Sequence, residues 1–204
     1  MRSLLISSRL LAAGASVLVA LGAAAFAAGP VPRPAQALDF TDSTGKHIVL
    51  SNLKGKVVVV QFLLTTCPHC QRFSQLLDKL QADYGPKGFQ AIGAAVNEAT
   101  PEMARDYHAQ YAQAFPVGPL PEGFVRPFLG MSVMERPGFP QIAVIDRKGQ
   151  IREQTTSENV AQPLQDEAHL RALVEKLLAE GAAAPSKSGA AVTQKSPGTV
   201  AAAK

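Results

Sequence analysis

Tryptophan is absent from this chain of 204 residues, and cysteine occurs only twice. The two cysteines, Cys67 and Cys70, are separated by Pro68 and His69 alone. One pair excludes the multiple-disulfide framework of many small secreted domains. No cysteine precedes Cys67, which excludes a membrane anchor on an acylated N-terminal cysteine. No third cysteine exists either, so a redox-active pair would have to be recycled by another molecule.

Acidic residues are missing from the first 37 positions, which contain three arginines and an apolar, Ala- and Leu-rich run over about 10–28. A basic start followed by an apolar run and small residues is typical of a secretory signal, with cleavage expected after Ala27 or Ala37. About 19 apolar residues can also span a bilayer. We therefore expect residues 1–37 to be a signal peptide or an N-terminal membrane anchor with a Pro-rich linker. The protein would then be periplasmic or otherwise extracytoplasmic, and residues 10–28 could tether it to the inner membrane.

Acids are also missing from residues 181–204, which consist of small residues, Pro and three lysines. This segment has too little apolar bulk to fold and is expected to be a disordered low-complexity tail. Residues 38–180 hold all 16 acids and 14 of the 20 Lys and Arg, so their net charge is near −2. They show no basic stripe with interleaved aromatics, which argues against nucleic acid as a partner. Their length suits one domain.

Apolar periodicity within residues 38–180 predicts an alternation of strands and helices. The expected strands are a pair in 38–56 turning at 43–45, then 57–64, 89–96 and a hairpin in 141–155 turning at Asp146–Gly149. The expected helices are 68–84, 101–114, one short turn within 116–138, and 163–180. The order β-α-β, α, β-β, α implies an α/β fold with a central mixed sheet and helices on both faces.

The cysteine pair lies where strand 57–64 is followed by helix 68–84, so Cys67 occupies a helix N-terminus. Free backbone N–H groups and the positive end of the helix dipole stabilise a thiolate there. Pro68 loses no hydrogen bond at the first helical position. His69, if charged, would stabilise the thiolate further. Cys70 follows one turn later, so we assign Cys67 as the attacking thiol and Cys70 as the resolving thiol.

Two other uses of a close cysteine pair can be compared with this one. A structural disulfide between Cys67 and Cys70 would close too small a loop to restrict the unfolded chain much. Zinc requires four ligands, and the chain offers two thiols and four scattered histidines without a second ligand motif. Copper(I) needs only two thiolates, so a copper(I)-binding or delivery module remains an alternative.

Residues 38–180 resemble the thioredoxin fold, and specifically the exported TlpA/ResA-like thiol-disulfide oxidoreductases of the redoxin group. The likeness rests on "FTDSTGKHIVLSNLKGKVVVVQF", on "TTCPHC", on "GFPQIAVIDRKGQI" and on the insertion that precedes this last segment. The resemblance implies that Pro140 is a cis-proline facing the cysteines and that Phe139 pairs with the substrate backbone. It also implies protein thiols or disulfides as substrates, no organic cofactor, and a membrane redox partner that recycles the pair.

Near the motif this sequence departs from the family at one place and from thioredoxin at another. Thr66 stands where the family usually has Trp, so Thr66, Phe139 and Pro140 are expected to form a substrate surface with altered preference. Gln61 occupies the place of the buried acid of thioredoxin and cannot accept a proton. Glu98 matches the spacing of a glutamate that approaches the motif in some members. It would accept the proton of Cys70, or else be an exposed acid at a helix start.

The direction of electron flow stays open. The dipeptide Pro68-His69 matches the strongly oxidising DsbA proteins, whereas the overall pattern favours a reductant. A peroxiredoxin-type peroxidase is a weaker alternative, because that chemistry needs Pro and Thr or Ser where this chain has Val60 and Leu64. A further alternative is a docking module without redox activity, which would show no disulfide exchange.

Overall fold

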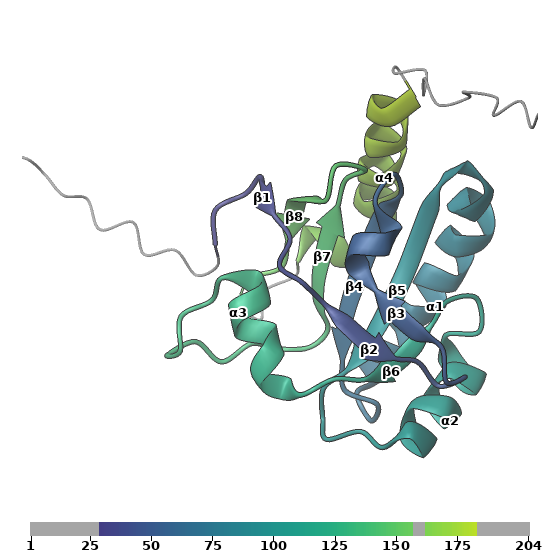
Figure 1. Ribbon diagram of the computed structural model, residues 1–204, viewed down its shortest axis with the longest axis vertical. Coiled ribbons are helices and arrows are strands. Elements are labelled where there is room, and N and C mark those ends of the chain that lie inside the picture. Colours follow the sequence, from purple (N-terminus) through teal and green to yellow (C-terminus); the bar gives the residue numbers. More distant parts are fainter. Residues whose placement is uncertain (1–28, 157–161, 183–204) are drawn as a thin grey trace, which may run out of the picture.

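The computed structural model describes residues 29–156 and 162–182, which fold around one six-stranded mixed sheet (Figure 1). The strand order is β1-β8-β7-β4-β5-β6, and β2 and β3 form a separate antiparallel pair. The strands are β1 (Arg33–Pro34), β2 (Asp39–Thr41), β3 (His47–Val49), β4 (Val57–Leu63), β5 (Phe89–Ala95), β6 (Val117–Pro119), β7 (Gln141–Ile145) and β8 (Gln150–Gln154). The outer strands β1 and β6 are short, and each ends in proline.

The segments expected at the two ends lie largely outside the described residues. These are the apolar run over 10–28 and the low-complexity tail beyond residue 182. Among the residues that the structure does describe, no helix combines the length and apolar character needed to cross a membrane.

The centre of the sheet is β4, whose seven residues are all buried. It pairs in parallel with β5 and antiparallel with β7, so neither of its edges is free. Its run of four valines suits this place, because β-branched side chains pack well in a strand covered on both faces. Since β4 ends at Leu63, the cysteine motif emerges from the middle of the sheet.

Helices cover both faces of the sheet, as predicted (Figure 1). Their bounds are α1 (Pro68–Tyr84), α2 (Pro101–Tyr111), α3 (Val125–Leu129) and α4 (Glu167–Ala182). Helices α1 and α4 pack with one set of β4 side chains, including Val57 and Val59. Helix α3 and the β2–β3 pair pack with the alternate set, including Val58 and Val60. The thioredoxin-like α/β fold class is confirmed.

Several element boundaries differ from the prediction. Helix α2 ends at Tyr111, and β6 follows where only an irregular stretch was expected. Helix α4 begins at Glu167, because the Asp166 carboxylate accepts a hydrogen bond from His169 N at 2.9 Å and caps the helix. Strand β1 adds Arg33 and Pro34 to the sheet, although these residues were assigned to the linker.

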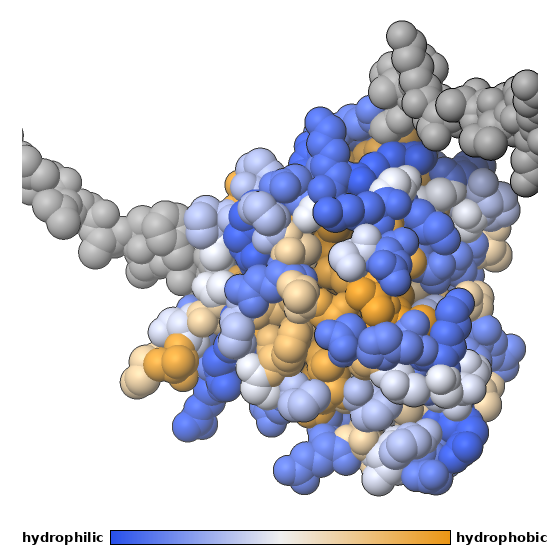
Figure 2. Space-filling view, in the orientation of Figure 1, coloured by the Kyte–Doolittle hydropathy of each residue, from blue (hydrophilic) through white to orange (hydrophobic). Residues whose placement is uncertain are grey.

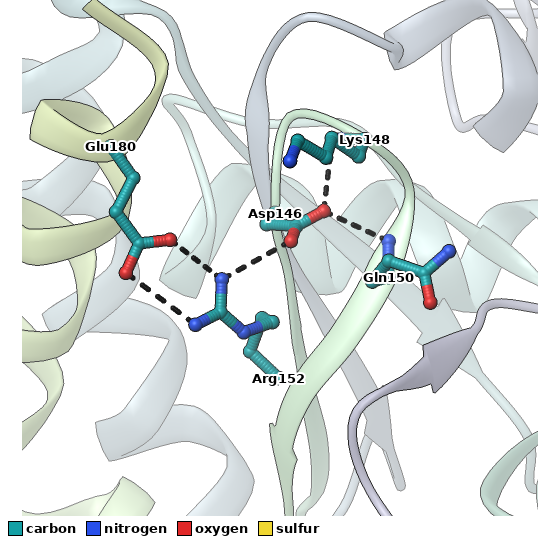
Figure 3. A network of polar contacts seen from close by, with 5 residues as sticks. All are labelled: Asp146, Lys148, Gln150, Arg152 and Glu180. Carbon is teal, nitrogen blue, oxygen red and sulfur yellow. Dashed lines mark hydrogen bonds and ion pairs between the residues drawn. The ribbon is translucent and has the colours of Figure 1, made fainter. Parts of the chain in front are cut away.

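The turn between β7 and β8 is fixed by one carboxylate and tied to α4 (Figure 3). Asp146 Oδ1 accepts hydrogen bonds from the backbone N–H of Lys148 and Gln150, both at 2.9 Å. Arg152 bridges Asp146, at 3.2 Å, and Glu180, at 2.7 Å. This hydrogen bond from Arg152 lowers the pKa of Glu180. The hairpin is therefore held against the closing helix.

An open hollow lies at the end of the sheet where β4 begins. It is lined mainly by apolar side chains of residues 35–37, of the 3-10 turn Leu50–Leu53, and of β4 and β7. The apolar surface in the middle of Figure 2 belongs to this region. The hollow lies at the opposite end of β4 from the cysteines.

Candidate active site

The two cysteines occupy the first turn of α1 and differ in exposure. Cys67 is the N-cap residue, with extended backbone (φ −85°, ψ 117°), and Pro68 opens the helix. Cys67 is half-buried and Cys70 is buried, and both thiols are free. The attacking role expected of Cys67 therefore falls on the more accessible sulfur, beside the unpaired N–H groups of a helix start.

Cys70 is held in conditions that keep its thiol protonated. Burial raises its pKa strongly, and the hydrogen bond and charge of Cys67 raise it further. A resolving thiol attacks as the thiolate. Resolution by Cys70 therefore requires either a base or the loss of charge from Cys67 when Cys67 enters a mixed disulfide.

A buried polar chain lies behind Cys70. Gln61 Nε2 donates to the Cys70 carbonyl at 3.0 Å, and Gln61 Oε1 accepts from Ser74 Oγ at 2.8 Å. The Ser74 hydroxyl also bonds the hydroxyl of Tyr107, at 2.8 Å. Burial raises the pKa of Tyr107, and the nearby cysteines raise it further. The chain is thus neutral throughout, so it fixes the position of Cys70 but offers it no base.

The segment before Cys67 is fixed by side chains from two other places. Asn97 Oδ1 accepts from Thr65 N at 3.2 Å, and Asn97 Nδ2 donates to Thr65 Oγ1 at 2.9 Å. Gln71 Nε2 donates to the Thr65 carbonyl at 3.2 Å. Thr65 is therefore a structural residue, and its neighbour Thr66 is left exposed beside the motif, as a substrate contact requires.

The residue pair Phe139-Pro140 lies against Cys67. The peptide bond between them is cis, and the Cys67 thiol donates to the Phe139 carbonyl with an S···O distance of 3.8 Å. Within the described parts of the chain, the N–H of Phe139 has no hydrogen-bond partner. An unpaired main-chain group next to the nucleophile suits strand-like pairing with an extended peptide.

His69 is exposed on the outer side of the motif and contacts Arg72. Arg72 Nη2 lies 3.1 Å from His69 Nδ1. Arginine has donors only, so we assign Nδ1 as the acceptor and the ring as neutral. In this arrangement the positive charge beside the motif belongs to Arg72. Both side chains border a shallow hollow that is completed by Phe73, Leu76 and Gln165.

Glu98 lies in the loop between β5 and α2, exposed and with left-handed backbone (φ 53°). Among the hydrogen bonds and ion pairs of the described residues, none connects Glu98 to either cysteine. The structure thus brings together Cys67, Cys70, Phe139 and Pro140, and it places Glu98 on an exposed loop without a bond to either sulfur.

Sequence patterns did not single out Asn97, Arg72, Ser74 or Tyr107. One signal for Asn97 was available: it follows β5, and the carboxyl ends of the parallel strands β4 and β5 lie at the same edge of the sheet. Among the described residues, no group of three or more His, Cys, Asp and Glu side chains is arranged to hold a metal ion.

Comparison with known proteins places this geometry in a family. The Redoxin family model matches residues 30–173. The thiol-disulfide oxidoreductase ResA of Bacillus thuringiensis (strain Al Hakam) is 28% identical over 139 residues, covering 61% of this chain and 69% of ResA. ResA of Halalkalibacterium halodurans is 35% identical over 85 residues, covering 40% of this chain and 47% of that protein.

Solved structures show the same likeness. A thiol:disulfide interchange protein of the thioredoxin family from Chlorobium tepidum TLS superposes with a TM-score of 0.61 at 26% identity, covering 74% of this chain and 99% of the other. The residues that the Redoxin model matches, 30–173, contain the cysteine pair and the cis-proline described above. The chain belongs to the Redoxin family and is a thiol-disulfide oxidoreductase of the thioredoxin superfamily.

Proposed function

We propose that this oxidoreductase is exported and exchanges disulfides with protein clients through Cys67 and Cys70. The observation that supports this most directly is the position of Cys67, at the start of α1 and 3.8 Å from the carbonyl of Phe139. The nucleophile thereby lies beside a backbone segment open to an extended peptide. Export is inferred from the basic and apolar character of residues 1–37.

In the reducing direction, the Cys67 thiolate attacks one sulfur of a client disulfide. A mixed disulfide forms, and the other client sulfur leaves as a thiolate that takes up a proton. Cys70 then loses its proton and attacks Cys67 Sγ, which releases the second client thiolate. Two electrons have passed to the client and the pair is left oxidised. A membrane redox partner is proposed to return the electrons, and the oxidising direction is the same sequence reversed.

Client contacts are assigned to Thr66, Phe139 and Pro140, and no cofactor beyond the cysteine pair is proposed. The neutral His69 and the charged Arg72 border the motif and are proposed to adjust its reactivity. Which direction operates depends on the reduction potential of the pair. A potential near that of thioredoxin, about −270 mV, indicates a reductant, and one near that of DsbA, about −120 mV, indicates an oxidant.

The test uses C67S and C70S in insulin reduction and in refolding of scrambled ribonuclease. We expect C67S to lose exchange entirely, and C70S to accumulate mixed disulfides that mass spectrometry detects on Cys67. Stable client adducts formed by C67S through Cys70 would reverse the assigned roles. Tight stoichiometric copper(I) binding without any exchange would instead favour the delivery module.

Glu98 keeps its predicted role as proton acceptor for Cys70 as part of this proposal. The variant E98Q tests it in a single-turnover assay of mixed-disulfide decay. A rate reduced about tenfold or more is expected of a lost general base. An unchanged rate excludes Glu98 from the reaction and leaves it as an exposed acid near the start of α2.

A further inference from the structure

Exposed apolar side chains are few on this molecule and lie in two short segments. Among the described residues, the large hydrophobic side chains that are exposed are Val31 (40%), Val133 (84%) and Met134 (86%). Single exposed hydrophobics are common on soluble proteins, whereas a group of them marks a contact surface. Val133 and Met134 are adjacent and form such a group.

Hydrogen bonds and close packing hold the first described residues against the end of α3. Gly29 N donates to the Leu129 carbonyl at 3.0 Å, and Arg33 Nη2 donates to the Phe128 carbonyl at 2.8 Å. At Gly130 an added Cβ would lie 2.8 Å from Gly29 Cα, so the two glycines are in close contact. Residues 29–33 thus run along the end of α3, where the loop with Val133 and Met134 begins. Figure 2 shows apolar atoms projecting at the left edge, where Figure 1 has this loop.

The loop is held in a defined shape that presents its tip. Arg126 Nε donates to the Glu135 carbonyl at 3.0 Å, and Ser132 N donates to the Glu135 carboxylate at 3.0 Å. These bonds close the loop on both sides of Val133 and Met134. Arg136 follows and is exposed, so a positive charge stands next to the apolar tip.

The sequence that joins this surface at Gly29 is the apolar run over residues 10–28. We propose that the surface formed by Val133, Met134 and Arg136, here called the junction face, rests on a lipid bilayer. Val133 and Met134 enter the interface between head groups and acyl chains, and Arg136 contacts anionic head groups. A bilayer is favoured over a protein client because the chain enters this part of the fold directly from the run over residues 10–28, whose sequence is long and apolar enough to enter a membrane.

This placement would also orient the enzyme. The loop that carries Val133 and Met134 continues directly to Phe139, whose carbonyl accepts a hydrogen bond from the Cys67 thiol. A chain resting on the junction face would hold its cysteine pair close to the membrane surface. The inference does not depend on the direction of electron flow or on the identity of the client.

The absence of tryptophan makes a direct test available. The full-length M134W chain, reconstituted in vesicles of phosphatidylethanolamine and phosphatidylglycerol, has a single tryptophan as reporter. The matched control is K79W, at an exposed site on α1, on the opposite side of the sheet from α3. We expect M134W fluorescence to shift to the blue on reconstitution and to be quenched by brominated lipid several-fold more than K79W fluorescence.

Other outcomes would overturn the proposal. Equal quenching of M134W and K79W would show that the junction face has no special relation to the bilayer, as would a full-length chain that fails to float with vesicles. M134W fluorescence that shifts to the blue when a reduced, unfolded client protein is added, but not when lipid is added, would show that the junction face binds clients and not a bilayer. The insulin assay on both variants shows independently whether disulfide exchange is intact.

Discussion

At Cys70 the surroundings favour the neutral thiol. Burial raises its pKa, and the side chain that donates a hydrogen bond to its carbonyl is the amide of Gln61, not an acid. Below its pKa, the thiolate fraction of a group rises about tenfold for each pH unit. We therefore expect the decay of a mixed disulfide in the wild-type chain to speed up steadily between pH 6 and pH 8, as measured by quenched-flow gel analysis.

The variant Q61E adds the missing base at that position. A buried glutamate has a raised pKa and can accept a proton near neutral pH. We expect mixed-disulfide decay in Q61E to be about tenfold faster at pH 7 and to depend less on pH. The control is Y107F, which removes the far end of the same polar chain without adding a base. Equal acceleration by Y107F would show that loosening of the site, not proton transfer, is responsible.

Beside the motif, the positive charge that acts on Cys67 is expected to be that of Arg72. His69 accepts a hydrogen bond from Arg72 and so is neutral in this structure. We expect R72M to slow alkylation of Cys67 by iodoacetamide at pH 7 by about two- to fivefold, as suits one partly screened charge. H69Q should change the rate much less. A larger effect for H69Q than for R72M would show that the positive charge acting on Cys67 is that of His69.

On the scale of elements, β6 depends on a close approach to β2. A Cβ added at Gly118 would lie 2.4 Å from the Thr41 carbonyl oxygen and 2.6 Å from the Phe40 ring. Backbone cannot yield as a flexible side chain can, so we expect G118A to cost about 1–3 kcal/mol in urea unfolding. The matched control is G123A, where an added Cβ meets nothing within 4 Å. Equal stability of the two variants would contradict this account.

Long elements with strong apolar periodicity could be predicted, and short ones could not. Helix α1 and the hairpin of β7 and β8 follow from local patterns in the sequence. By contrast, β1 and β6 have two and three residues, and their pairing is set by backbone neighbours that are distant in the chain.

The same division holds within the site. Cys67 and Cys70 were evident from a local motif, and Phe139 and Pro140 from a resemblance. The hydrogen bond between Ser74 and Tyr107 joins residues 33 positions apart on different helices. Both residues also fit an ordinary helix, so no local pattern separates them from the rest of α1 and α2.

For the whole molecule, the described fold begins before the domain boundary that composition suggested. Ala35 N donates to the Gly149 carbonyl at 2.9 Å, and Arg33 bonds both Phe128 and Gln154 at 2.8 Å. With each hydrogen bond contributing about 1 kcal/mol, removal of residues 1–37 should cost about 2–4 kcal/mol more than removal of residues 1–28. Urea unfolding of the two truncated chains measures the difference, and equal midpoints would place β1 outside the stable fold.

The two edge strands of the sheet affect where an unfolded protein chain can bind to this molecule. Unfolded proteins carry unpaired strands, which add readily to any open sheet edge. Here both edge strands are very short and contain a proline, Pro34 in β1 and Pro119 in β6, which donates no backbone hydrogen bond. Extension of the sheet by a bound chain is thereby disfavoured. If the proposed function holds, main-chain pairing is directed instead to the open N–H of Phe139, and a captured strand would then lie beside the sulfur of Cys67.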